Sequence, residues 1–119
     1  MTRILIVDDQ PSFRLQLRQL LSLAGLETVV EAGDIPTAVE LSRSHQPDLA
    51  IVDVVLPGIN GFEGVALLKS VVPNLRVFLV SAHRDRAEIF QAAAHQAGAE
   101  AFITKDDLDL DLVNQWKNL

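Results

Sequence analysis

The stretch Ile-Leu-Ile-Val-Asp-Asp-Gln (residues 4–10) decides the fold class of this 119-residue chain. Its four apolar residues follow one another without polar alternation, and two acids come directly after them. Such a run is typical of a strand buried on both faces, as in a parallel sheet. We therefore predict a short central strand whose carboxyl end carries Asp8 and Asp9.

Four further apolar runs follow along the chain, at residues 28–30, 49–52, 77–80 and 101–103. Segments with the apolar spacing of helices separate them, so the order is strand then helix, five times. Connections that each carry a helix imply parallel strands, right-handed crossovers and helices on both faces of the sheet. The sequence predicts one doubly wound α/β domain over residues 1–119, with a five-stranded parallel sheet.

Each predicted helix carries one apolar stripe, and Gly25, Pro73 and Gly98 are placed to end the first, third and fourth. The stripes are Phe13, Leu17, Leu20, Leu21 and Ala24; Ile35, Ala38 and Val39; Val65, Leu68 and Val72; Ala87, Phe90, Ala94 and Ala97; and Leu108, Leu112, Trp116 and Leu119. Asp106 or Asp107 is expected to cap the last helix. Residues 108–112 also alternate like a strand, which leaves that helix start open.

The composition restricts the function. A net charge of −6 argues against nucleic-acid binding by this domain, which needs a basic patch. Arg14 and Arg18, one helical turn apart, are interpreted as a solvated helix face. The absence of cysteine excludes disulfides, thiolate zinc sites and cysteine nucleophiles. No apolar run has the length of a membrane span. We expect a cytoplasmic protein.

Chemistry is expected where the strands end, because ligands of open α/β sheets bind outside the carboxyl ends of the strands. The residues at those ends are Asp8, Asp9, Asp53, Ser81, Thr104 and Lys105. Three carboxylates together repel one another unless a cation lies among them. Mg²⁺ is favoured over zinc because no imidazole or thiolate stands at these positions.

Lys105 and Ser81 add an ammonium and a hydroxyl to these acids. A metal ion and the Lys105 ammonium would neutralise a dianionic group on one carboxylate, and the Ser81 hydroxyl could donate a hydrogen bond to it. These groups suit phosphoryl transfer, in which positioning and charge neutralisation supply most of the catalysis. The simpler alternatives are helix capping by Asp8 and Asp9 and a structural ion pair at Lys105.

Four motifs resemble those of the receiver domains of bacterial two-component response regulators, the CheY-like superfamily. They are Ile-Leu-Ile-Val-Asp-Asp-Gln (4–10), Asp-Val-Val-Leu-Pro-Gly-Ile-Asn-Gly (53–61), Val-Ser-Ala-His (80–83) and Ala-Phe-Ile-Thr-Lys (101–105). Each alone is weak, but all four occur in the family's order along the whole chain. The resemblance implies a flavodoxin-like fold with strand order 2-1-3-4-5.

The resemblance also implies roles for these residues. Asp53 would be the phosphoacceptor, Asp9 the direct Mg²⁺ ligand and Asp8 an assisting ligand, often through water. Asp53 and the backbone carbonyl of Val55 would complete the protein's share of the metal shell. Lys105 would pair with the phosphoryl group, and the Ser81 hydroxyl would move to donate a hydrogen bond to it. Phe102 would be the aromatic residue that turns inward once that hydroxyl has moved.

Partners follow from the same resemblance. The phosphoryl donor would be a sensor histidine kinase or a histidine phosphotransfer protein. A downstream protein or a fused output domain would read the surface formed by the fourth helix, the fifth strand and the fifth helix. The domain would not be a classical enzyme, although it would catalyse its own phosphorylation and dephosphorylation. Whether phosphorylation also drives dimerisation is left open, as is whether the chain is complete or part of a longer regulator.

Three positions depart from the family's usual pattern. Asp106 replaces the common proline after the lysine, so we expect a trans peptide bond or a strained loop there. Phe102 replaces the frequent tyrosine, and Ser81 the commoner threonine.

Three other functions are alternatives to a receiver. One is a pseudo-receiver that binds partners without phosphate, although such proteins usually lack one of these acids or the lysine. A haloacid-dehalogenase-like phosphatase needs a second aspartate where this chain has Val55. A flavin or nucleotide carrier is disfavoured because Gly58, Gly61 and Gly64 match no nucleotide-binding fingerprint.

Overall fold

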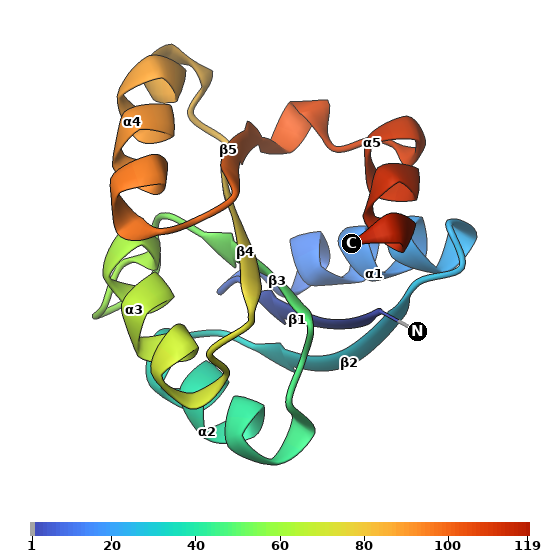
Figure 1. The fold of residues 1–119 in the computed structure, drawn as a ribbon. Helices are drawn as coiled ribbons and strands as arrows, with labels where there is room; N and C mark the ends of the chain where they lie inside the picture. Colours follow the sequence, from blue (N-terminus) through green and yellow to red (C-terminus); the bar gives the residue numbers. More distant parts are fainter. Residues whose placement is uncertain (1) are drawn as a thin grey trace.

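The computed structural model describes residues 2–119, apart from the side chain of Val29. Five parallel strands form one sheet in the order β2-β1-β3-β4-β5, which confirms the expected topology (Figure 1). The strands are β1 (Arg3–Val7), β2 (Glu27–Ala32), β3 (Leu49–Asp53), β4 (Arg76–Ser81) and β5 (Ala101–Thr104).

Five helices cover the sheet, with α1 and α5 on one face and α2, α3 and α4 on the other (Figure 1). They are α1 (Pro11–Leu23), α2 (Ile35–His45), α3 (Gly61–Val71), α4 (Ala87–Ala97) and α5 (Leu110–Gln115). Short 3-10 helices cover Arg84–Arg86, Lys105–Asp107 and Trp116–Asn118. Within residues 2–119, no helix combines the length and apolar character that crossing a membrane requires.

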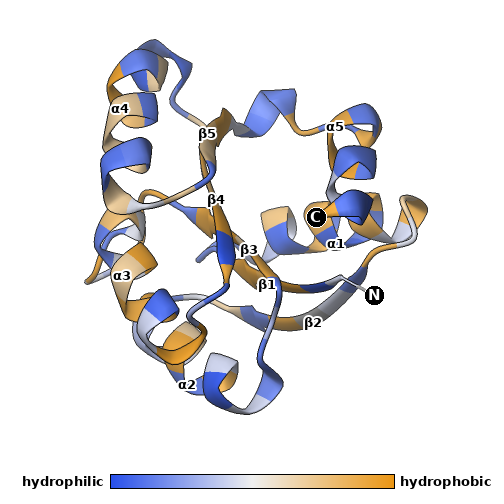
Figure 2. Ribbon diagram, in the orientation of Figure 1, coloured by the Kyte–Doolittle hydropathy of each residue, from blue (hydrophilic) through white to orange (hydrophobic). Residues whose placement is uncertain are grey.

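The central strands are mostly apolar along their length (Figure 2) and are buried on both faces, as the uninterrupted apolar runs predicted. Leu5 and Val7 of β1 pack with α2 and α3, whereas Ile4 and Ile6 pack with α1 and α5. All four of these side chains are fully buried. Because both faces of β1 and β3 are apolar, the first polar side chains after these apolar runs are Asp8, directly after β1, and Asp53, the last residue of β3.

The C-terminal segment differs from the sequence-based expectation. Asp109, not Asp106 or Asp107, caps α5 by accepting a hydrogen bond from the Leu112 N–H, so the helix begins at Leu110. Asp107 does not cap the helix, because its carboxylate accepts a hydrogen bond from the Thr104 hydroxyl at 2.8 Å. The strand-like alternation at residues 108–112 therefore belongs to the approach and first turn of this helix.

Trp116 closes the core on the α1–α5 face, as its place in the apolar stripe predicted. Its ring stacks on Phe78 with centroids 5.1 Å apart, and the residue is 2% exposed. The stripe was wrongly extended to Leu119, which is 45% exposed. The reason is that α5 ends at Gln115 and a 3-10 helix follows, which changes the direction of later side chains.

Gly61 sets the distance between the loop after β3 and the start of α3. A Cβ at this position would overlap the carbonyl oxygen of Asp53 and lie 2.9 Å from the Cα of Val54. The Gly61 N–H donates a hydrogen bond to the Val54 carbonyl at 2.9 Å. Only glycine permits this approach, so Gly61 helps to fix the backbone that carries Asp53.

We predict that Gly61→Ala destabilises the fold by about 3 kcal/mol, near the upper end of common single substitutions, because the clash is with backbone. Gly58→Ala is the matched control: its φ of +77° is strained for alanine, but no atom lies within 4 Å of a Cβ there. It should cost only about 1 kcal/mol. Urea unfolding of both variants measures the difference, and equal losses would contradict the close-approach account.

Candidate functional site

The carboxyl ends of β1 and β3 bring three acids together at one edge of the sheet. One carboxylate oxygen from each of Asp8, Asp9 and Asp53 lies within 4.8 Å of the other two. Asp8 and Asp53 are buried, whereas Asp9 is exposed. The structure therefore brings the predicted acids together in one cluster, with Asp9 on its exposed side. We call these three residues the acid pocket.

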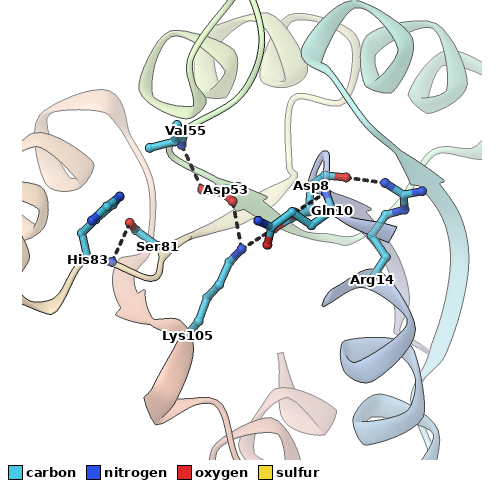
Figure 3. Close-up of polar contacts among 8 residues, drawn as sticks. All are labelled: Asp8, Gln10, Arg14, Asp53, Val55, Ser81, His83 and Lys105. Carbon is cyan, nitrogen blue, oxygen red and sulfur yellow. Dashed lines mark hydrogen bonds and ion pairs between the residues drawn. The ribbon is translucent and has the colours of Figure 1, made fainter. Parts of the chain in front are cut away.

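Lys105 reaches into the acid pocket from the end of β5 (Figure 3). Its ammonium nitrogen lies 2.7 Å from Asp8 Oδ2 and 3.0 Å from Asp53 Oδ2, and its side chain is only 12% exposed. The ring of Phe13 in α1 covers the same ammonium, with its centroid 4.0 Å away. An ammonium over an aromatic face is attracted by the ring quadrupole. Three residues thus surround one positive charge.

Backbone amides hold the other oxygens of the two buried acids. Asp53 Oδ1 accepts a hydrogen bond from the Val55 N–H at 2.9 Å, and Asp8 Oδ1 accepts one from the Gln10 N–H at 2.8 Å (Figure 3). Asp8 Oδ2 is fully buried and has no hydrogen bond of good geometry, although the Lys105 ammonium lies close to it. That ammonium is the group that balances the charge of Asp8, and Asp53 shares it. Together with the other acids, Asp8 Oδ2 is the ligand type that a hard divalent cation such as Mg²⁺ takes.

Burial is the main cause of the shifted pKa of Asp53. Desolvation raises the pKa of its carboxyl to about 6, although the Val55 N–H and the Lys105 ammonium each lower it. Burial alone would lower the pKa of Lys105, but hydrogen bonds and charge from Asp8 and Asp53 raise it above the ordinary value. The pocket is therefore short of positive charge when all its acids are ionised, and a further cation would favour the Asp53 carboxylate.

Ser81 and Phe102, the predicted switch pair, are both buried. The Ser81 hydroxyl oxygen accepts a hydrogen bond from the His83 N–H at 3.1 Å (Figure 3). The ring of Phe102 is 3% exposed and meets Phe90 edge-on, with centroids 5.2 Å apart. Phe102 thus lies inward, packed against Phe90 of α4. An aromatic with no hydroxyl gains nothing from solvent, and Phe90 supplies an apolar neighbour.

Arg14 and Arg18 were interpreted as a solvated helix face, which is wrong for Arg14. Its guanidinium donates a hydrogen bond to the Asp8 carbonyl at 2.5 Å (Figure 3) and lies 3.3 Å from the carboxylate of Glu31, with which Arg18 also pairs. Arg14 therefore ties α1 to the chain at the end of β1. The sequence feature that could have predicted this ion pair is Glu31, an acidic residue directly after the second apolar run.

Phe13 is the other residue near the pocket that the sequence did not single out. Its spacing assigned it to the apolar stripe of α1, and it does pack against that core. Periodicity cannot show that one edge of the stripe meets a lysine that lies 92 positions later in the chain.

The loop after Lys105 has ordinary geometry. No peptide bond in residues 2–119 is cis, so Lys105–Asp106 is trans, one of the two expected outcomes. Arg84 lies 3.3 Å from Asp106 and 3.5 Å from Asp107 across the loop surface. All three side chains are mostly exposed, so these pairs contribute little stability.

We predict that Asp53 titrates with a pKa of about 6 in metal-free protein. Because this exceeds the model-peptide value of 3.8, the native state binds the proton more tightly. The free energy of unfolding should then fall as pH rises from about 4 to 6, by at most about 3 kcal/mol from this group. Carboxyl ¹³C NMR gives the pKa, and Asp53→Asn should flatten the pH dependence. A pKa of Asp53 below 4 would contradict the burial argument.

The comparisons with known proteins agree with this geometry. Residues 4–115 match the family model of the response regulator receiver domain. The chain is 39% identical over 112 residues to the transcriptional regulatory protein NarL of Mycobacterium tuberculosis, an alignment covering 93% of this chain and 51% of NarL. It is 34% identical over 119 residues to the chemotaxis protein CheY of Bacillus subtilis, covering 98% of each.

A solved structure shows the same similarity in three dimensions. One chain in the crystal structure of the CheX–CheY–BeF3–Mg²⁺ complex from Borrelia burgdorferi superposes with a TM-score of 0.84 at 28% identity, covering 96% of this chain and 84% of that one. The present chain spans about half the length of NarL and most of the length of CheY. The chain therefore belongs to the response regulator receiver domain family of two-component signal transduction.

Proposed function

We propose that Asp53 accepts a phosphoryl group from a phosphohistidine of a partner protein, in a reaction that requires Mg²⁺. The observation that carries this proposal is the position of the Asp53 carboxylate, 3.0 Å from the Lys105 ammonium and within 4.8 Å of oxygens of both Asp8 and Asp9. An oxygen of Asp53 would attack phosphorus while the bond between phosphorus and the donor's imidazole nitrogen breaks. The imidazole leaves neutral, and Asp53 becomes an acyl phosphate.

The metal would be held by Asp9, Asp8, Asp53 and the backbone carbonyl of Val55. The bound ion would supply charge neutralisation for the phosphoryl oxygens. The exposed Asp9 gives the pocket its opening to solvent, and the Val55 N–H keeps Asp53 Oδ1 oriented. Asp8 is held by the Gln10 N–H through Oδ1, and its Oδ2 lies 2.7 Å from the Lys105 ammonium.

Lys105 would shift from neutralising two acids to pairing with the phosphoryl group. Its ammonium already lies 3.0 Å from Asp53 Oδ2, so it needs only a small displacement to reach an oxygen bonded there. Phe13 limits its motion on the α1 side and Asp8 limits it on the β1 side. These contacts would pre-organise the positive charge, which is the main way that such sites stabilise phosphoryl transfer.

The signal would leave the site through Ser81 and the aromatic residues beside α4. A phosphoryl group adds roughly two negative charges and three acceptors, which would draw the Ser81 hydroxyl away from the His83 N–H. Because Phe102 is already inward, we propose that it repacks against Phe90 rather than entering from solvent. Among the residues of α4 only Ala94 is fully buried, so little apolar surface holds this helix in place.

The partners proposed are a sensor histidine kinase or histidine phosphotransfer protein as donor, and a downstream protein or fused output domain as receiver of the signal. The signalling surface would be the face formed by α4, β5 and α5. Autodephosphorylation by water would return Asp53 to its starting state and release inorganic phosphate.

Acetyl phosphate tests the phosphoacceptor directly. The intact mass of the 119-residue chain should increase by one phosphoryl group with Mg²⁺ present, and not with EDTA. Asp53→Asn should abolish the increase, whereas Asp48→Asn, an exposed acid at the opposite end of β3, should leave it unchanged. No increase in folded wild-type protein, with a rapid-quench control for fast hydrolysis, would contradict the proposal and favour a phosphate-independent pseudo-receiver.

Phe13→Leu tests the pre-organisation of Lys105. The change keeps apolar volume but removes the ring face, which is worth about 1 kcal/mol to a partly buried cation, so phosphorylation by acetyl phosphate should slow about fivefold. In a Lys105→Ala background the same change should have no further effect on the rate. An equal slowing in both backgrounds would show that Phe13 acts through packing alone.

A further inference from the structure

The carboxylate of Asp9 differs from the other two acids of the acid pocket because no protein group supports it. Backbone N–H groups hold one oxygen of Asp8 and one of Asp53, and the Lys105 ammonium lies beside both acids. Within residues 2–119 the Asp9 carboxylate forms neither a hydrogen bond nor an ion pair, although one of its oxygens lies within 4.8 Å of oxygens of the other two acids. The place of Asp9 in the pocket therefore depends on the backbone that carries it.

The peptide group between Asp8 and Asp9 is held by α1. The Asp8 carbonyl lies beyond the end of β1 and accepts a hydrogen bond from the Arg14 guanidinium at 2.5 Å (Figure 3). The Asp8 N–H donates a hydrogen bond to the Ala32 carbonyl at 3.0 Å. Because a peptide group is planar, a carbonyl held in one direction also fixes the position of the next Cα, which is that of Asp9. Arg14 thus acts on Asp9 through the backbone.

Arg14 is itself anchored to the sheet. Its Nε lies 3.3 Å from Oε1 of Glu31, and both side chains are only 22% exposed. Glu31 belongs to β2, which pairs with β1, and it also pairs with Arg18. The backbone at Gly33 passes beside the same group, since a Cβ there would lie 3.9 Å from Arg14 Nη1 and 4.0 Å from the Cα of Asp9. The rigid, planar guanidinium therefore joins β2 to the peptide that follows β1.

The charge of Arg14 does not suit a direct part in cation binding. A positive charge near the acid pocket opposes the entry of Mg²⁺. The guanidinium donates its hydrogen bond to a backbone carbonyl, and its ion pair is with Glu31, which is not an acid of the pocket. Groups that orient the ligands of a metal without binding it act in this way, and their loss commonly lowers affinity for the metal about 10- to 100-fold.

We propose that Arg14 is a positioning residue that holds Asp9 in the acid pocket through the Asp8 carbonyl. Without this hydrogen bond the Asp8–Asp9 peptide would rotate, and the exposed Asp9 carboxylate would move away from the other two acids into solvent. The effect on Mg²⁺ binding rests on the proposed function, whereas the effect on the order of the peptide does not. Two measurements therefore test the proposal.

The first measurement uses Arg14→Met, which removes the hydrogen-bond donors and keeps most of the apolar stem. Titration of the full 119-residue chain with Mg²⁺, followed by amide chemical shifts, should give a Kd about tenfold higher than that of wild type. Charge alone predicts the opposite, because removing a cation near three acids should strengthen Mg²⁺ binding. A Kd that is unchanged or lower in Arg14→Met would overturn the proposal.

The matched control is Arg18→Met. Arg18 carries the same charge and pairs with the same Glu31, but its guanidinium forms no hydrogen bond with Asp8. Its side chain is 46% exposed, so its loss should change the Kd for Mg²⁺ by less than about twofold. Urea unfolding verifies that both variants are folded. An equal rise in Kd in the two variants would show a general effect of the ion pairs of Glu31 and would overturn the proposal.

The second measurement needs no metal. ¹⁵N relaxation in EDTA gives the order parameter of the Asp9 amide, which is about 0.85 for rigid backbone and below about 0.6 for flexible backbone. Arg14→Met should lower it into the flexible range, whereas wild type and Arg18→Met should stay rigid. If wild type binds no Mg²⁺ but the order of Asp9 still depends on Arg14, the metal site of the proposed function fails and the positioning role stands. If Mg²⁺ binds but Asp9 stays rigid in Arg14→Met, only the positioning role fails.

Discussion

The placement of one ammonium group between two buried carboxylates is the constraint on which the rest of this structure depends. Asp8 and Asp53 end two adjacent central strands whose other side chains are apolar on both faces. Two buried carboxylates at this spacing would repel strongly, and Lys105 offsets that repulsion by lying 2.7 and 3.0 Å from them. Because Lys105 follows β5, this one contact ties the sheet's edge strand to its centre.

The compensation is incomplete, and that incompleteness makes the site chemically useful. One ammonium cannot neutralise three acids. Burial raises the pKa of Asp53 to about 6 even though Lys105 lowers it, and Asp8 Oδ2 has no hydrogen bond of good geometry. A fold under selection for stability alone would satisfy that oxygen or replace the acid. A cation that enters past the exposed Asp9 would relieve both costs, and an anionic phosphoryl group could then be accommodated.

The sequence predicted what depends on local pattern and failed where distant segments meet. Uninterrupted apolar runs identified β1 and β3, and strand ends located Asp53 and Lys105, because carboxyl ends of parallel strands share one edge. Strand order came from family resemblance. Periodicity could not place Phe13 over Lys105 or Arg14 beside Glu31, since each pair joins different elements. The α5 cap was misplaced by two or three residues because several aspartates there were equally suitable by local rules.

The two acidic regions of the molecule differ in how their charge is balanced, and this difference separates their roles. The acid pocket is balanced from within by Lys105, so the repulsion it retains acts on the protein's own conformation. The surface between α4 and α5 carries three aspartates: Asp107 pairs with Arg84, Asp109 caps α5, and Asp111 is exposed. Phe102 lies beside this surface and meets Phe90 of α4 edge-on. A rearrangement that begins at Ser81 would therefore reach the surface between α4 and α5 through packing, with no need for a charge interaction across the domain.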